Sequence, residues 1–186
     1  ADIDWLNLVF QFDLTEHSLP WLNAVLVQYI GYGLRDERSS GKFNYNRSWI
    51  LKDCKTLFCV GGATQNGTAL ISIPGDAIQF LDPLQLAYMG QFLKARITRV
   101  DICKDFFLGE YNIEQALEDY EKRRFRSRGA GRNPSKKFIE SSSPYGNEGR
   151  TLYVGKRENG KVIRVYEKGL QMGLKKSEFS KWVRVE

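Results

Sequence analysis

A tyrosine flanked by two cations is the feature of the sequence best suited to chemistry. Arg164, Tyr166 and Lys168 alternate along the run VIRVYEK, which predicts that they share one face of a strand. A phenol oxygen can attack phosphorus and form a covalent intermediate. Neighbouring cations would lower the pKa of the phenol and stabilise negative charge in the transition state. The same pattern is typical of an ordinary half-exposed strand, so both interpretations stay open at this point.

The element that would position this tyrosine is a β-hairpin over residues 151–168, centred on Asn159-Gly160. That dipeptide favours a two-residue type I′ turn, because both turn positions need a positive φ. Such a turn would place Tyr153 directly opposite Tyr166. It would also place Gly155 on the same face, where the missing side chain would leave open space. Aliphatic residues of both strands would then pack into the core from the other face.

A second predicted strand, residues 97–107, alternates in the same way. Val100 and Ile102 are expected to face the core, and Asp101 and Asp105 to face the opposite side. If this strand lies beside the hairpin, its carboxylates and the tyrosine would converge on one face of a sheet. Ordinary surface ion pairs would produce the same pattern.

The closing run WVRVE predicts a last strand that presents Glu186 on that face. Carboxylates are the ligands that hard divalent ions such as Mg²⁺ or Mn²⁺ prefer. The chain has one histidine, His17, so a site with two histidines is excluded. A divalent ion bound to carboxylates could polarise a phosphodiester, and phosphoryl transfer is therefore the chemistry that these residue types favour.

The positive charge of the chain is concentrated in residues 122–137, which we call the basic segment. The net charge is +6 and the pI about 9.2, which makes a polyanionic partner plausible. The basic segment holds eight of the 28 basic residues and no acidic one, and its composition predicts a mobile loop after a helix. We expect it to contact a nucleic-acid backbone. The side chains predicted to bind DNA are Arg123, Arg124, Arg126, Arg128, Arg132, Lys136, Lys137, Tyr153 and Arg157.

The order of strand and helix patterns indicates an α+β fold. Helices are predicted over residues 18–30, 75–94 and 112–124, with strand patterns between them and hairpins joining several strands. This order favours a central, largely antiparallel sheet with helices packed on one face. A length of 186 residues suits a single catalytic domain over residues 1–186, which we expect to be excised from a longer chain.

The composition also indicates the cellular compartment of the protein. The cysteines Cys54, Cys59 and Cys103 lack metal-site spacing and fit buried thiols in a reducing environment. No run approaches the length of a membrane span, and no secretory signal is present at the start. We therefore expect a cytoplasmic protein without a membrane partner.

Four blocks, in this order, resemble the replication initiation factor family of rolling-circle plasmids and filamentous phages. They are the opening strand IDWLNLVF, the strand ITRVDICKDFF, the hairpin TLYVGKR with RVYEK, and the closing WVRVE, and together they span most of the chain. Conjugative relaxases of some integrative elements are similar. The resemblance implies a fold related to the HUH nucleases, which are themselves related to ferredoxin-like and RRM folds. It also implies an endonuclease that nicks single-stranded DNA at an origin and leaves a 5′-phosphotyrosine and a free 3′-OH.

The resemblance also implies roles for particular residues. By position, Tyr166 would be the nucleophile, and Arg164 and Lys168 would assist it. Single-stranded DNA and hairpin DNA of the origin would be the substrates, in the cytoplasm of a host cell if a phage or plasmid encodes the protein. A host helicase and a second copy of the chain are further partners to be expected.

The metal site implied by the resemblance would bind Mg²⁺ or Mn²⁺. Asp101 matches the acidic strand residue of the family and Glu186 its late glutamate, so both are expected ligands. The family often carries Glu or Gln on the strand where Ser72 stands in this chain. Asp105 is therefore the candidate for a third ligand.

Two alternatives share most of these features. A conjugative relaxase would use the same chemistry and differ only after nicking. A basic α+β module without catalytic activity would use Tyr153, Tyr166 and Arg164 as a platform for stacking and phosphate binding.

Overall fold

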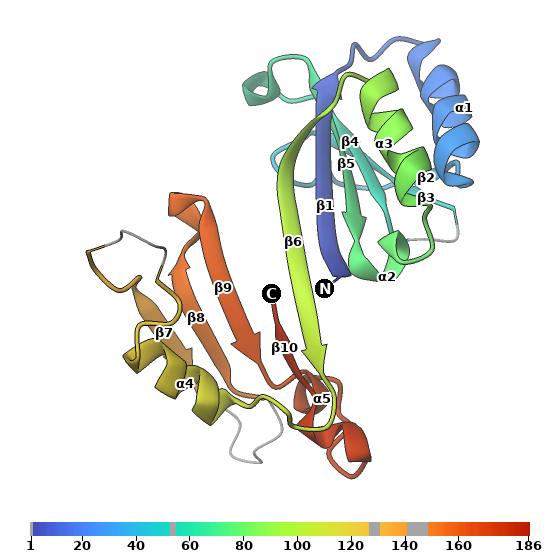
Figure 1. The fold of residues 1–186 in the computed structure, drawn as a ribbon. Coiled ribbons are helices and arrows are strands. Elements are labelled where there is room, and N and C mark those ends of the chain that lie inside the picture. The colour runs from blue at the N-terminus through green and yellow to red at the C-terminus, as the bar shows by residue number, and fades with distance from the viewer. Residues whose placement is uncertain (1, 53–54, 127–130, 141–148) are drawn as a thin grey trace. The chain divides into compact units, whose positions relative to one another are not determined.

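The computed structural model describes residues 2–52, 55–126, 131–140 and 149–186 (Figure 1). These residues form two compact units. The amino-terminal unit is Ile3–Ile102, and the carboxy-terminal unit is Cys103–Glu186 together with Asp2. Strand β6 (Arg96–Phe106) contains the boundary between the two units.

The amino-terminal unit is a sheet with strand order β2-β3-β4-β5-β1-β6. The pairs from β2 to β1 are antiparallel. The strands are β1 (Asp2–Gln11), β2 (Leu34–Glu37), β3 (Arg47–Leu51), β4 (Leu57–Val60), β5 (Thr68–Pro74) and β6. The helices are α1 (Ser18–Ile30), the single-turn α2 (Gly75–Ile78) and α3 (Pro83–Phe92), and a short 3₁₀ helix, η1, spans Ala63–Gln65.

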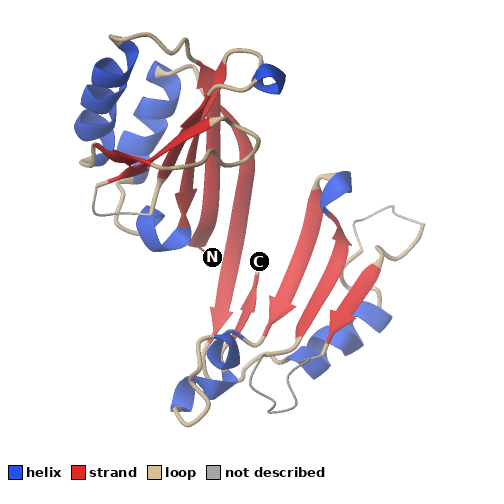
Figure 2. Cartoon of the chain, turned by 180° about the vertical axis from the view of Figure 1, so that it is seen from behind, coloured by secondary structure: helices blue, strands red, loops and turns tan. Residues whose placement is uncertain are grey.

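Alternation along β1 separates the two faces of this sheet. Leu6, Leu8 and Phe10 pack against residues of α1 and α3 in the main core of the unit. Val9 lies on the other face, in a smaller cluster with Tyr45, Cys59 and Leu70. Figure 2 shows α1 and α3 side by side on one face of these strands. Residues of two loops, 43–45 and 64–66, lie at the opposite face.

Local signals explain where the helices of this unit begin and end. The Asp82 carboxylate accepts a hydrogen bond from the Leu84 amide at 2.8 Å, and Pro83 occupies the first helical position of α3. Helix α1 ends where Gly31 adopts a φ of 75°, a conformation that glycine reaches without steric cost.

The carboxy-terminal unit is a sheet with strand order β6-β10-β9-β8-β7, in which the described pairs are antiparallel. Helix α4 packs on one face through Ile113 and Ala116, against Leu152 and Val165. An Asn112–Gln115 capping box starts α4. The elements after β6 are α4 (Ile113–Glu121), β7 (Lys136–Ile139), β8 (Thr151–Lys156), η2 (Arg157–Asn159), β9 (Lys161–Tyr166), α5 (Lys168–Gln171), η3 (Glu178–Lys181) and β10 (Val183–Val185).

The predicted α+β class is confirmed in both units. Each has a largely antiparallel sheet with helices on one face, as expected from the order of the sequence patterns. Cys59 and Cys103 are buried thiols, and burial raises the pKa of Cys59 to about 11. Cys54 lies outside the described residues. Among the described residues, no helix has the length and apolar character needed to cross a membrane.

The hairpin β8–β9 closes through a longer turn than the Asn159-Gly160 signal predicted. Residues 157–159 form a turn of 3₁₀ helix, and Gly160 follows with a φ of 74°. Tyr153 consequently faces Arg164 instead of Tyr166. The predicted register is wrong by two residues, but the residues of β8 and β9 keep their predicted faces because the pleat of a strand repeats every two residues. Lys168, predicted on the strand, lies in the helix that follows it.

Gly155 does not provide the open space that we expected beside the tyrosine. It has a φ of 93° and faces Val162, and an added Cβ would lie 2.7 Å from the carbonyl oxygen of Lys161. Its N–H donates to the carbonyl of Ser135 at 2.8 Å. Glycine is therefore needed here for close approach of the backbone.

The face prediction for β6 is also wrong in its apolar part. Val100 is 46% exposed and Ile102 is 58% exposed, whereas Cys103 is buried. The main core of the amino-terminal unit contains no residue of 96–102, because its helices cover the other strands. Alternation alone cannot tell which face of a strand a helix will cover.

Two short strands were missed. Lys136–Ile139 forms β7 instead of the end of a loop, because Phe138 faces Leu152 and packs beside α4. The polar strand β2 pairs with β3, where Arg47 binds Glu37 at 2.6 Å. Both strands lie at the end of a strand order, and their four-residue length gives little periodicity to detect.

Candidate functional site in the carboxy-terminal unit

Three polar side chains form a row across neighbouring strands of this unit. Arg184 of β10 is the cross-strand partner of Asp105 on β6 and of Tyr166 on β9. Val165 directly precedes Tyr166 and Val183 directly precedes Arg184, and both valines pack in the core beneath α4. Strand alternation therefore directs the row to the face opposite α4, as the sequence predicted.

Asp105 is held by two donors. Arg184 donates through Nε to Oδ1 at 2.8 Å and through Nη2 to Oδ2 at 2.7 Å, and the Trp182 indole donates to Oδ1 at 2.6 Å. Burial raises the pKa of Asp105, but the bonds from Arg184 and Trp182 and the charges of Arg184 and Lys168 outweigh it. The net effect lowers the pKa below the ordinary value, so Asp105 is ionised at neutral pH.

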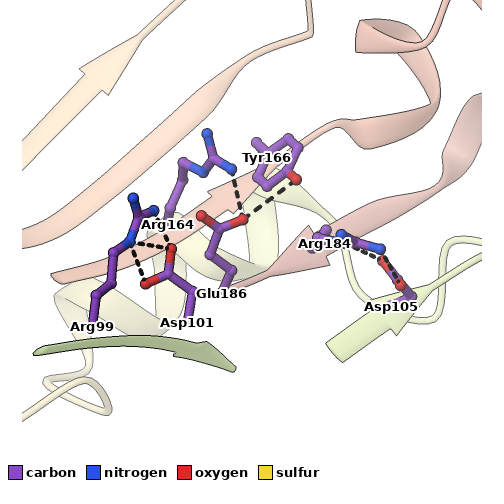
Figure 3. A network of polar contacts seen from close by, with 7 residues as sticks. All are labelled: Arg99, Asp101, Asp105, Arg164, Tyr166, Arg184 and Glu186. Carbon is purple, nitrogen blue, oxygen red and sulfur yellow. Dashed lines mark hydrogen bonds and ion pairs between the residues drawn. The ribbon is translucent and has the colours of Figure 1, made fainter. Parts of the chain in front are cut away.

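Tyr166 lies beside a second ion pair (Figure 3). Arg164 Nη2 donates to Glu186 Oε2 at 2.6 Å, and the Tyr166 hydroxyl donates to the same oxygen at 3.5 Å. The backbones of Arg164 and Glu186 also exchange hydrogen bonds of 2.8 and 2.9 Å, which fixes their side chains next to each other. A carboxylate thus lies at the phenol oxygen.

Two cations cover the ring of Tyr166, which is only 3% exposed. The Arg164 guanidinium carbon lies 4.2 Å from the ring centroid, and Lys168 Nζ lies 5.6 Å from it. Burial lowers the pKa of Arg164, but the hydrogen bond to Glu186 and the charge of Glu186 raise it by more. The net shift of this pKa is therefore upward. Lys168 is the first residue of α5, directly after the strand that carries the tyrosine.

This arrangement contains the groups that phosphoryl transfer to a tyrosine requires. Glu186 can accept the proton of the phenol. Arg164, Lys168 and Arg184 can neutralise charge on phosphate oxygens, and guanidinium groups bind such oxygens in pairs. Arg164 Nε is buried, and no hydrogen-bond partner for it is found among the described residues.

Asp101 lies in the amino-terminal unit and is paired there. Arg99 Nε donates to both Asp101 oxygens at 3.0 Å (Figure 3), and the Arg99 guanidinium stacks 4.6 Å from the Trp5 ring. Each of the three predicted ligands, Asp101, Asp105 and Glu186, therefore binds an arginine. The described residues contain no group of three or more His, Cys, Asp or Glu side chains that could hold a metal ion. The arrangement does not fit a preformed metal centre, and the predicted ion stays a prediction.

The predicted DNA-binding residues of the basic segment are exposed wherever the structure describes them. Arg123, Arg124, Arg126 and Arg132 all face solvent, and Arg124 binds Asp119 at 2.6 Å. Phe125 instead packs against the core beside α4. Arg128 lies outside the described residues.

The remaining predicted DNA contacts divide between two faces. Lys137 faces Tyr153, which faces Arg164, so these three residues extend the face of Tyr166. Lys136 points to the side of α4, where its Nζ lies 4.7 Å from the Tyr120 ring. Arg157 is exposed in the turn η2.

Two residues of the site escaped the sequence interpretation. Trp182 fixes Asp105, and Thr151 is the cross-strand partner of Tyr166. Trp182 lies two residues before Arg184, and this spacing was a signal that it shares the face. Thr151 could not be placed without the correct hairpin register.

The fold is similar to a solved structure described as a rolling circle replication initiator protein from Geobacillus stearothermophilus. The sequence identity is 22%, the TM-score is 0.68, and the match covers 98% of this chain and 71% of that chain. At this identity, the likeness shows a shared fold. No curated protein sequence matches the chain.

The sequence of the carboxy-terminal half matches a known protein family. Residues 95–186, which include Asp101, Tyr166 and Glu186, match the family described as replication initiation factor. This match confirms the resemblance that we inferred from the sequence blocks.

Proposed function

We propose that the chain initiates rolling-circle replication by nicking and rejoining single-stranded DNA at an origin, with Tyr166 as nucleophile. The family match supports a role in replication initiation, and the name of the similar solved structure suggests the rolling-circle mode. DNA is the partner that this role requires. A host helicase and a second copy of the chain remain further expected partners.

In the proposed step, the Tyr166 oxygen attacks the phosphorus of one phosphodiester. A bond forms between that oxygen and phosphorus, and the bond between phosphorus and the 3′ oxygen breaks. The phenol proton passes to Glu186, and the departing 3′ oxygen takes a proton from solvent. The products are a 5′-phosphotyrosine and a free 3′-OH, and rejoining is the reverse reaction.

The observation that carries this proposal is the contact of the Tyr166 hydroxyl with Glu186 Oε2 at 3.5 Å, beneath the Arg164 guanidinium. It supplies a proton acceptor and a counter-charge at one phenol oxygen. It also favours Tyr166 over Tyr153, the alternative nucleophile, which lies one cross-strand pair further along the sheet.

Access to the phenol requires a movement. Because Tyr166 is 3% exposed, a phosphodiester must displace a cation from the ring before its phosphorus can reach the oxygen. We propose that Arg164 and Lys168 move from the ring to the phosphate. The attraction of these cations to the phosphate would replace their weaker attraction to the ring.

Dependence on Mg²⁺ or Mn²⁺ is proposed from the family resemblance alone. Asp101 and Glu186 are each proposed as ligands, which would require each to exchange its arginine for the ion. Asp105 remains a candidate ligand, but its two donors suit a role in positioning Arg184. No step above passes through the metal.

The test is formation of a covalent adduct. The protein is incubated with a single-stranded oligonucleotide from the origin of its own replicon, with Mg²⁺ or Mn²⁺, and the adduct is separated on a denaturing gel. Tyr166→Phe is expected to abolish the adduct, and Tyr153→Phe, the matched control on the neighbouring strand, to retain it.

Other outcomes assign other functions. An adduct in Tyr166→Phe would rule out Tyr166 as nucleophile. Binding without any adduct would favour the module that only binds nucleic acid. An adduct formed on a transfer origin and not on a replication origin would favour a relaxase.

A further inference from the structure

The amino-terminal unit contains a cavity that the proposed chemistry does not use. It has a volume of about 460 Å³ and lies on the face of the sheet opposite α1 and α3. All its lining residues belong to this unit. Its size falls within the range of about 300–1,000 Å³ typical of small-molecule sites. It can therefore take one ligand of moderate size, and a DNA duplex is too wide to enter.

The floor of the cavity is apolar. Val9 and Leu70 are cross-strand partners on β1 and β5, and they are 9% and 3% exposed. Tyr45 lies beside them, and its hydroxyl is 3.2 Å from Thr68 Oγ1. A flat, apolar surface of this kind suits one side of an aromatic ring.

The walls carry amides and hydroxyls. Asn7, Gln11 and Asn66 contribute amide groups, and Thr98 contributes a hydroxyl. The Asn7 Oδ1 atom accepts a hydrogen bond from the Trp5 indole at 2.8 Å, which orients its amide nitrogen, a double donor, for a ligand. Amides of this kind recognise the donor and acceptor pattern on the edge of a nucleobase.

Charge around the cavity is restricted to one sign. Arg96 is the one charged side chain among the described lining residues, and none of those residues is acidic. A single guanidinium beside uncharged amides suits a ligand with one phosphate group. The absence of acidic lining residues in this part of the structure removes repulsion of a polyanion.

The rim of the cavity has an unusual backbone. Phe43 and Asn44 have φ values of 55° and 65°, the left-handed region that phenylalanine rarely adopts. Gln65 Nε2 donates to the Asn44 carbonyl at 3.3 Å, and the Tyr45 amide donates to the Lys42 carbonyl at 2.9 Å. These bonds hold the Phe43 ring, 43% exposed, at the edge of the cavity. Strain of this kind is concentrated at ligand clamps.

We propose that this cavity binds one unpaired nucleotide of the DNA strand on which the protein acts. The base would lie between the Phe43 ring and the apolar floor, with its polar edge toward Asn7 and Gln11. The adjoining phosphate would contact Arg96. The inference rests on the proposed function only for the identity of the ligand as DNA.

A chain of contacts gives the cavity a further role in positioning. Asn7 binds Trp5, Trp5 stacks with Arg99, and Arg99 binds Asp101, all within the amino-terminal unit. A base bound at Asn7 would therefore be linked to the acidic residue of β6 through two packed side chains. Binding one base would select the register in which the strand is held.

Photocrosslinking tests the cavity directly. The Tyr166→Phe protein, which cannot form an adduct, is irradiated with a single-stranded 12-mer of thymidine in which one position is 5-iododeoxyuridine. Crosslinks are mapped by mass spectrometry. They are expected on the peptide that contains Phe43 and Tyr45. Gln11→Ala and Arg96→Gln, made separately in this background, should each lower the crosslink yield and the affinity about 5- to 10-fold.

Matched controls are available in the same unit. Gln91→Ala removes an exposed amide from α3, and Arg35→Gln removes an exposed arginine from β2. Both should leave crosslinking unchanged. Circular dichroism and the thermal midpoint establish that each variant is folded.

The inference is overturned if crosslinks form only on other peptides, or if the Gln11 and Arg96 variants bind and crosslink like the controls. Either result would leave adduct formation by the wild-type protein intact, and the proposed function would stand. If the wild-type protein forms no adduct but crosslinks still map to Phe43 or Tyr45, the proposed function is contradicted and the cavity remains a DNA-binding site.

Discussion

Antiparallel sheets with helices on one face occur in both units, but the opposite faces of the two sheets differ in charge. In the carboxy-terminal unit this face carries the pairs Asp105–Arg184 and Glu186–Arg164 around Tyr166. In the amino-terminal unit it carries uncharged amides and one arginine, Arg96, over an apolar floor. The first arrangement suits chemistry at a phosphate, and the second suits recognition of a base.

This difference indicates how one architecture can serve two tasks. Phosphate contacts position a nucleic acid without distinguishing its sequence, whereas contacts to base edges distinguish sequence. Ion pairs also fix long, flexible side chains in one rotamer, which such side chains would not keep on their own. We expect substitutions on the two faces to fail in different ways: loss of rate on one, and loss of selectivity on the other.

The largest effect after loss of the nucleophile is expected for Glu186→Gln. The amide cannot accept the phenol proton, so the rate of adduct formation should fall about 100-fold or more. Single-turnover kinetics measures this rate. Glu37→Gln is the matched control, because Glu37 also pairs with an arginine but lies on an exposed strand of the other unit. An equal loss in both variants would show that any ion pair matters and would remove the contrast between the faces.

A smaller effect concerns stability and pH. Asp105→Asn should lower the free energy of unfolding by about 1–3 kcal/mol at pH 7, because Arg184 loses its charged acceptor. The folded-state pKa of Asp105 lies below its ordinary value, so its contribution is present above about pH 4 and is lost as the pH falls through the folded pKa.

Denaturation in urea at several pH values measures this contribution. The difference between wild type and Asp105→Asn should shrink as the pH falls below about 4. A difference that is the same at about pH 3 and pH 7 would show that packing, and not charge, is responsible. Glu37→Gln should change stability by less than about 1 kcal/mol, since the pair with Arg47 is exposed.

The smallest effect per residue is expected in the basic segment. Changing Arg123, Arg124 and Arg126 to Gln should flatten the salt dependence of DNA binding, by about 0.7–0.9 in the log–log slope for each phosphate that the protein no longer neutralises. Fluorescence anisotropy at several salt concentrations gives the slope. Replacing Arg35, Arg38 and Lys42 of the amino-terminal unit is the control for net charge. Equal slopes for the two triple variants would show that the segment does not bind DNA specifically.

Much of this architecture could be predicted because long alternating runs determine which residues share a face. The run before Tyr166 placed Arg164 and the phenol on one side, and the closing strand placed Glu186 there as well. The partners of the carboxylates could not be predicted in the same way. Arg184 pairs with Asp105, and Arg164 with Glu186, through cross-strand register, which depends on how the strands are ordered.

The cavity could not be predicted from the sequence for a related reason. Its walls come from β1, β5, β6 and two loops, and no sequence spacing connects Gln11 with Arg96. Strand alternation puts Asn7 and Gln11 on one face of β1, but only the fold shows that residues of two loops line the cavity on that face. The left-handed backbone of Phe43 could not be predicted, because phenylalanine rarely adopts it, although Asn44 is of a type that often does.

The turn between β8 and β9 has a consequence for how this protein can vary over evolution. Four residues connect β8 and β9, two more than the shortest hairpin turn needs. These two extra residues leave Tyr166 and Arg164 on the face that a two-residue turn would give them. Gains or losses of two residues in this turn preserve the faces of both strands, whereas a change of one must be absorbed by a bulge or would reverse the faces of β8 relative to β9. Natural relatives should therefore tolerate turns whose lengths differ by even numbers, and sequence drift at this tip should proceed in paired steps.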